Sequence, residues 1–149
     1  MVSSSSSSSV MARLKAETTE HHARAEGKSL QRAMVSGGLG RPVLADFFEQ
    51  LWLVHAALEA EIDRHREAEP MLRVVPDEQR HSPRLEDDLQ YLGREAHTRM
   101  ALPATGRLID AIIEAARACP AALLGMHYVL EGSMNGNRFI AVALRRTLG

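Results

Sequence analysis

The strongest constraint on the fold is an amphipathic repeat in the middle of the chain. Between residues 43 and 66 the side chains of one stripe recur at the i, i+3, i+4, i+7 spacing of an α-helix, namely Leu44, Phe47, Phe48, Leu51, His55, Leu58 and Ile62. Such a stripe must be covered by other elements. Because no segment alternates apolar and polar residues for long, no strand is predicted. The repeat therefore indicates an all-α fold organised around a helix over 43–66.

Glycine and proline divide the rest of the chain into further helices. A mostly polar helix is predicted over 11–34 and is ended by Gly37, Gly38 and Gly40. Others are expected from residue 84, over 104–118 and, after Pro120, over 121–148. We expect a bundle of about five helices over 11–149, preceded by a disordered serine-rich tail over 1–10. The apolar side chains expected to face inward are Leu85, Leu89, Leu92, Leu108, Ile109, Ile112 and Ile113.

Composition excludes several classes of protein. The chain has 149 residues, which suits one domain. Lys and Arg total 18 against 19 for Asp and Glu, so the basic excess that nucleic-acid binding needs is missing. One cysteine cannot form a disulfide framework and fits a reducing cytosol. No apolar run approaches the roughly 18 residues that span a bilayer. We expect a cytoplasmic protein that binds neither nucleic acid nor membrane.

Two glycines interrupt the helical pattern of the last segment. Gly132 and Gly136 lie at i, i+4 and share one face, with Asn135 and Asn137 beside them. Each glycine inside a helix costs about 1 kcal/mol relative to alanine. One interpretation is that the backbone must kink or approach something flat. The other is close helix–helix packing, or a helix that ends and restarts. The pattern alone leaves both open.

An adjacent histidine pair, His21 and His22, lies in the middle of the first predicted helix. A neutral imidazole projecting from a helix is a good axial ligand for heme iron. Lys15 precedes His22 by seven residues, which places it on the same face about 10 Å away along the helix axis. That distance suits a cation that reaches an acidic group at the edge of a flat ligand. Such a pair on a polar helix is more often simply solvated.

The other reactive side chains favour no competing chemistry. His65, His81 and His97 are expected at the surface, and His55 as a hydrogen-bonded core residue. Only Glu78 and His81 have the spacing of a di-iron carboxylate site, and they lie in a proline-flanked loop. Cys119 has no basic neighbour, and no phosphate loop, dinucleotide fingerprint or nucleophile elbow is present.

Three separated stretches resemble the heme oxygenases, especially the biliverdin-forming bacterial enzymes found beside phytochromes. The stretch over 14–26 resembles the family's proximal helix, in which a Leu-Lys start precedes the iron-binding histidine. The stretch over 84–93 is similar to a Leu-Glu-x-Asp-Leu segment of the family. The stretch over 128–137 resembles the distal helix, whose glycines let backbone lie over the heme face.

The resemblance implies a fold, a reaction and a set of residues. Heme b would be both substrate and cofactor, and it would be opened to biliverdin with release of CO and ferrous iron, using O2 and an external reductant. His22 would bind the iron, with His21 as the alternative ligand, and Lys15 would pair with a propionate. On the distal side the implied residues are Tyr128, Gly132 and Gly136 as heme contacts, and Ser133 or Asn137 ordering the distal water.

The resemblance also implies partners and shows two departures. The electron donor would be a ferredoxin, a flavodoxin or a reductase, and a bacteriophytochrome would accept the product. Asn137 stands where the family usually has a second glycine. Family members continue with further helices, so the stop at Gly149 leads us to expect a C-terminally incomplete domain. A non-catalytic heme carrier or sensor, or a heme-free helical interaction module, are the alternative functions.

Overall fold

The computed structural model describes residues 9–96, 98, 100–133 and 137–148. Over these residues it contains α-helices and short 3-10 helices and no strand, which confirms the all-α prediction. The α-helices are α1 (Val10–Glu26), α2 (Ser29–Ser36), α3 (Arg41–His65), α4 (Ser82–Tyr91), α5 (Pro103–Ala118), α6 (Ala122–Ser133) and α7 (Asn137–Leu148). The 3-10 helices are η1 (Pro70–Val74) and η2 (Asp77–Gln79).

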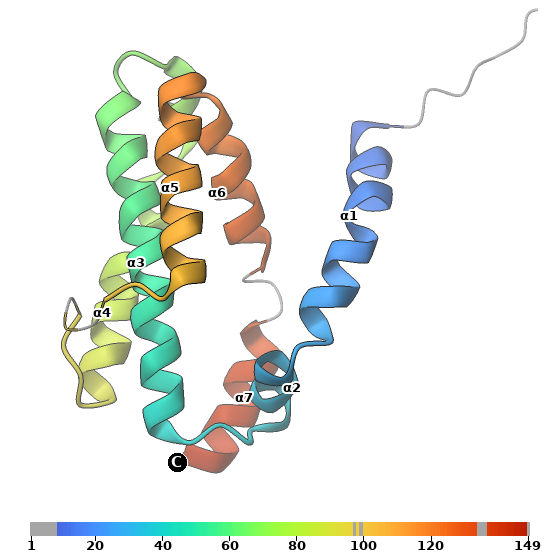
Figure 1. The fold of residues 1–149 in the computed structure, drawn as a ribbon, viewed down its shortest axis with the longest axis vertical. Coiled ribbons are helices and arrows are strands. Elements are labelled where there is room, and N and C mark those ends of the chain that lie inside the picture. The colour runs from blue at the N-terminus through green and yellow to red at the C-terminus, as the bar shows by residue number, and fades with distance from the viewer. Residues whose placement is uncertain (1–8, 97, 99, 134–136, 149) are drawn as a thin grey trace, which may run out of the picture.

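Helix α3 is the centre of the bundle, as its amphipathic repeat predicts. It begins after Gly40 with Pro42 in its first turn, where a missing N–H costs nothing. It packs against α4, α5 and α6 (Figure 1). The main core lies between α3, η1, α5 and α6, and its buried members are Val54, Leu58, Ile62, Leu72, Val75, Ile112, Ala116 and Leu123.

Two smaller apolar clusters attach the remaining helices. Met34, Leu39 and Leu44 are buried where α2 meets the start of α3, and Ile140 of α7 packs against them. Trp52 of α3 is buried against Leu85 and Leu89 of α4. The indole Nε1 of Trp52 also donates a hydrogen bond to Oε1 of Glu86, at 3.0 Å.

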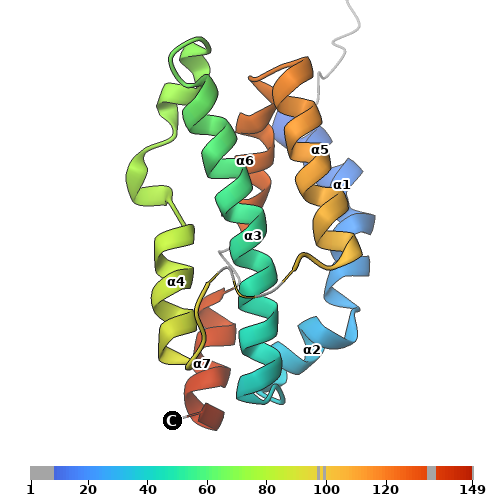
Figure 2. The ribbon, with the colours of Figure 1, turned by 60° about the vertical axis from the view of Figure 1, so that its left-hand side comes forward.

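Helix α1 stands apart from this bundle. It contacts α2, and Figure 1 shows most of its length separated from the helices of the core. Figure 2 gives a second view of the bundle, with α3 in front. Its first turn is capped by Ser9, whose hydroxyl accepts a hydrogen bond from the backbone N–H of Ala12. The polar composition of α1 explains this placement, since a helix with a thin apolar stripe has little surface to bury.

Helix boundaries depart from the prediction in two places. The expected helix over 11–34 is two helices, because Gly27 ends α1 and Lys28 is extended, with φ −72° and ψ 145°. The expected helix over 121–148 is also divided, into α6 and α7. The structure thus has seven α-helices over its described residues rather than about five.

The residues predicted to face inward are buried or half-buried except Leu108, and one residue predicted at the surface, His81, is buried. Leu85, Leu89 and Ile112 are buried. Leu108 was expected inside α5 but is 44% exposed, because it borders an apolar groove. His81 was expected at the surface but is 5% exposed, because it is enclosed by α3 and α6.

Candidate functional site

Helix α6 exposes an apolar face that contains one of the predicted glycines. Gly125, Tyr128, Val129 and Gly132 follow the i, i+3, i+4, i+7 spacing and are all exposed. Tyr128 is 57% exposed and Val129 65%. We call these four residues the glycine face.

Neither glycine of this face is required by packing within the described protein. A Cβ atom built on Gly125 or on Gly132 would meet no atom within 4 Å. Close helix–helix packing therefore does not explain Gly132, although a glycine in a helix costs about 1 kcal/mol. The bare backbone is instead available to a molecule outside the described chain.

An apolar groove of about 340 Å³ adjoins the glycine face. Val54 of α3 forms its floor together with Ile112 of α5, and Leu108 lies at its exposed edge. The α6 residues that line it are Ala122, Gly125, Met126, Val129 and Leu130. Continuous apolar surface of this kind suits a large hydrophobic ligand.

Helix α1 carries the predicted iron ligand in an accessible position. Both His21 and His22 are exposed. The guanidinium of Arg24 donates to Nδ1 of His21, at 2.6 Å, so that ring is engaged within its own helix. Within the described part of the chain no hydrogen bond or ion pair engages the ring of His22. Lys15 is exposed two turns before it.

The structure does not bring all the predicted site residues together. Tyr128 and Gly132 share the glycine face, whereas Lys15 and His22 lie on α1, which stands apart from α6 (Figure 1). Gly136 lies outside the described residues, and Ser133 and Asn137 are described in their backbone only. Among the described residues no cluster of three His, Cys, Asp or Glu side chains could hold a metal ion.

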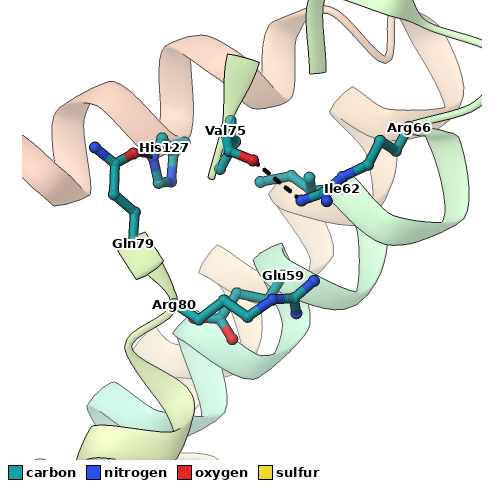
Figure 3. Close-up of a pocket in the computed structure, with 7 residues that line it drawn as sticks. All are labelled: Glu59, Ile62, Arg66, Val75, Gln79, Arg80 and His127. Carbon is teal, nitrogen blue, oxygen red and sulfur yellow. Dashed lines mark hydrogen bonds between the residues drawn. The ribbon is translucent and has the colours of Figure 1, made fainter. Parts of the chain in front are cut away.

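A cluster of buried and half-buried polar residues lies on the side of α6 away from the glycine face. His55 and Glu59 of α3, His81 and Ser82 at the start of α4, and His127 and Glu131 of α6 meet there. The rings of His55 and His81 are 4.8 Å apart between centroids. Figure 3 shows Glu59, Gln79, Arg80 and His127 around a small pocket beside this cluster. Sequence reasoning missed it, because its partners are 22 to 50 residues apart.

Comparison with known proteins identifies the family to which this chain belongs. The family model for heme oxygenase matches residues 8–146. The chain belongs to the heme oxygenase family. A heme oxygenase of Rhodella violacea is 27% identical over 130 residues, which are 85% of this chain and 55% of that protein. The chain thus spans little more than half the length of that relative.

Solved heme oxygenases share the fold of this chain. The enzyme of Leptospira interrogans superimposes with a TM-score of 0.81 at 23% identity, over 91% of this chain and 67% of that one. Heme oxygenase-1 of Synechocystis sp. PCC6803, solved in complex with heme, gives 0.81 at 19% identity, over 91% and 63%. The described helices of this family member include none long and apolar enough to cross a membrane.

The residues of this heme oxygenase family member fit a porphyrin in three respects. The glycine face offers backbone that no side chain covers. The adjoining groove is apolar, as a porphyrin face requires. The ring of His22 is accessible, and an imidazole is one of the side chains that can bind heme iron.

Buried His55 and half-buried His127 make the stability of the fold depend on pH. Burial, reinforced by the neighbouring His81, lowers the pKa of His55 from 6.5 to about 4. Burial also lowers the pKa of His127. The ring of His55 is therefore neutral in the folded protein at pH 7, and protonating either ring opposes folding.

We expect the free energy of unfolding to fall as the pH drops from about 6.5 to 4. Above pH 6.5 His55 is neutral in both states, and below it the unfolded chain takes up the proton first. The loss from His55 reaches up to about 3 kcal/mol. Urea unfolding at pH 7.5, 5.5 and 4.5 measures it. His55→Gln should reduce the change of the unfolding free energy with pH and leave the contribution of His127. The exposed control, His21→Gln, should not reduce it. Equal slopes in all three proteins would contradict the assignment.

Proposed function

We propose that this chain binds heme between His22 and the glycine face and opens it oxidatively to biliverdin, with release of CO and ferrous iron. The observation that carries the proposal is the open space above Gly125 and Gly132 on an exposed apolar face. Membership of the heme oxygenase family supports it. Bound heme would supply the reactive centre that activates O2, as well as being the substrate.

The residues of the chain would bind and orient the heme. His22 would hold the heme iron through an imidazole nitrogen, and Lys15, about 10 Å along α1, would pair its ammonium with a propionate. Gly132 and Gly136 would keep side chains away from the opposite face, where Tyr128 would contribute contact area. Ser133 or Asn137 would hold the distal water by hydrogen bonding.

The same proposal includes the accessory components. Electrons would come from an external donor such as a ferredoxin, a flavodoxin or a reductase, and a bacteriophytochrome would accept the biliverdin. The family resemblance of the stretches over 14–26 and 128–137 supports these assignments. The same resemblance supports a cytoplasmic location.

Titration with hemin tests the proposal directly. We expect a Soret band that saturates at one heme per chain, followed by biliverdin formation when O2 and a reductant are supplied. Saturable binding without biliverdin would indicate the alternative function, a non-catalytic heme carrier or sensor. The absence of a stoichiometric Soret band would overturn heme binding altogether.

A further inference from the structure

Two hydrogen bonds fasten α6 to the short segment that precedes α4. Nε2 of His127 contacts Oε1 of Gln79 at 2.9 Å, and Oε2 of Glu131 contacts Nε2 of His81 at 2.7 Å. His127 and Glu131 are one turn apart on one face of α6, whereas Gln79 and His81 are separated by one residue. We call these four residues the clasp.

The distance between His127 and Glu131 along α6 matches the distance between Gln79 and His81 in the segment before α4. Four helical residues advance about 6 Å along the axis. Arg80, between Gln79 and His81, is extended, with φ −71° and ψ 131°. One extended residue between Gln79 and His81 separates their Cα atoms by about 6.6 Å, and both side chains reach α6. The segment before α4 therefore engages successive turns of α6, which fixes both the rotation of α6 and its position along its axis.

The segment that holds α6 is itself anchored to α3. Helix α4 has no capping side chain of its own. Instead Oε1 of Glu59 accepts hydrogen bonds from the backbone N–H groups of His81, at 2.7 Å, and Ser82, at 3.1 Å. The other carboxylate oxygen accepts the hydroxyl of Ser82. One turn further along α3, Asp63 accepts a hydrogen bond from Arg80, at 2.5 Å. Displacing the segment would break all of these contacts.

The His81–Glu131 contact joins a buried ring to a partly exposed carboxylate. The side chain of His81 is 7% exposed, and its ring also packs against the ring of His55. Water cannot readily replace a hydrogen bond to a ring this enclosed, so losing the acceptor would leave a buried polar nitrogen unsatisfied. Glu131 is 36% exposed, which means that its side chain can be changed without opening the core.

The clasp determines which side of α6 faces outward. Glu131 directly precedes Gly132, and successive helical residues are rotated by about 100°. Holding Glu131 against His81 therefore turns Gly132 away from α3 and into open space. Resting on the proposed heme function, we propose that Glu131 and His81, assisted by His127 and Gln79, are positioning residues that set the rotation of α6 and present the glycine face to the heme.

The test compares Glu131→Leu, which removes the acceptor, with Glu131→Gln, which keeps an oxygen for His81. The control, Glu67→Leu, removes an exposed ion pair with Arg73 at a distance from the clasp. In the heme-free protein, Glu131→Leu should speed amide hydrogen exchange in residues 128–133 by about tenfold, the effect of one charge-assisted hydrogen bond. Exchange in α5 should stay unchanged. The variant should also bind heme about tenfold more weakly and give a Soret band of altered position or width. Glu131→Gln should restore most of the parent behaviour.

The outcomes separate this proposal from the proposed function. If the parent binds no heme, the proposed function fails, and the exchange data from heme-free protein still decide whether the clasp controls α6. If Glu131→Leu speeds amide hydrogen exchange in all helices alike, the positioning role is overturned. The same holds if Glu131→Leu and Glu131→Gln behave identically. Gln79→Leu, which removes the other contact, should reproduce the same local exchange pattern.

Discussion

Replacing His22 with alanine is expected to abolish stoichiometric heme binding and biliverdin formation. His22 is an accessible imidazole on α1, and no contact within the described protein competes for its ring. Loss of an outer-shell partner alone costs 10–100-fold in metal affinity, so loss of the axial ligand should weaken binding by roughly 100-fold or more. Hemin titration followed at the Soret band measures this, and added imidazole should restore part of the parent spectrum by occupying the vacated position.

The matched control for this change is His21→Ala. Nδ1 of His21 is engaged by Arg24, and its ring points about 100° away from that of His22 around α1. We expect this variant to retain the Soret band and the activity of the parent. If His21→Ala loses heme while His22→Ala retains it, the ligand is His21. If both variants keep the parent spectrum, the heme site does not involve this pair.

Replacing Gly132 with leucine should separate stability from function. No atom lies within 4 Å of a Cβ at this position, and leucine is a better helix former than glycine, so the folded protein should be unaffected or stabilised by up to about 1 kcal/mol. Heme binding should instead weaken about tenfold or more, because the new side chain would occupy space needed for close backbone contact. Thermal unfolding and hemin titration of the same samples measure both effects.

Gly106→Ala is the control for the change at Gly132. Gly106 lies inside α5, and a Cβ there also meets nothing within 4 Å. This variant should gain stability through helix propensity while its heme affinity stays at the parent value. A leucine at 132 that leaves heme affinity unchanged would show that the glycine face does not contact the ligand.

Periodicity predicted the central helix well because its stripe must be buried whatever the rest of the fold does. The division at Gly27 was missed, since one glycine inside a helical pattern is often tolerated and nothing local announces the extended Lys28. The exposure of Leu108 was missed for a different reason. An apolar residue at helical spacing looks inward from the sequence, whether it meets a core or borders a groove.

The candidate site was predictable in its residues but not in its arrangement. The family resemblance pointed to His22 and Gly132, while the glycine pattern alone left packing and ligand contact equally open. Only coordinates could show that a Cβ at Gly132 would meet no neighbouring part of the described protein within 4 Å. The burial of His81 had no local signal either, because Glu59 and Glu131 come from helices distant in the chain.

The dependence of α4 on Glu59 has a practical consequence for following this molecule in solution. The first turn of α4 is capped by Glu59 of α3 and by no side chain of its own. Helix α4 should therefore lose its first turn whenever it moves away from α3. The chain's only tryptophan, Trp52, lies where α3 meets α4 and is tied to Glu86. Its fluorescence is therefore an intrinsic reporter of that junction, readable without any label or bound chromophore.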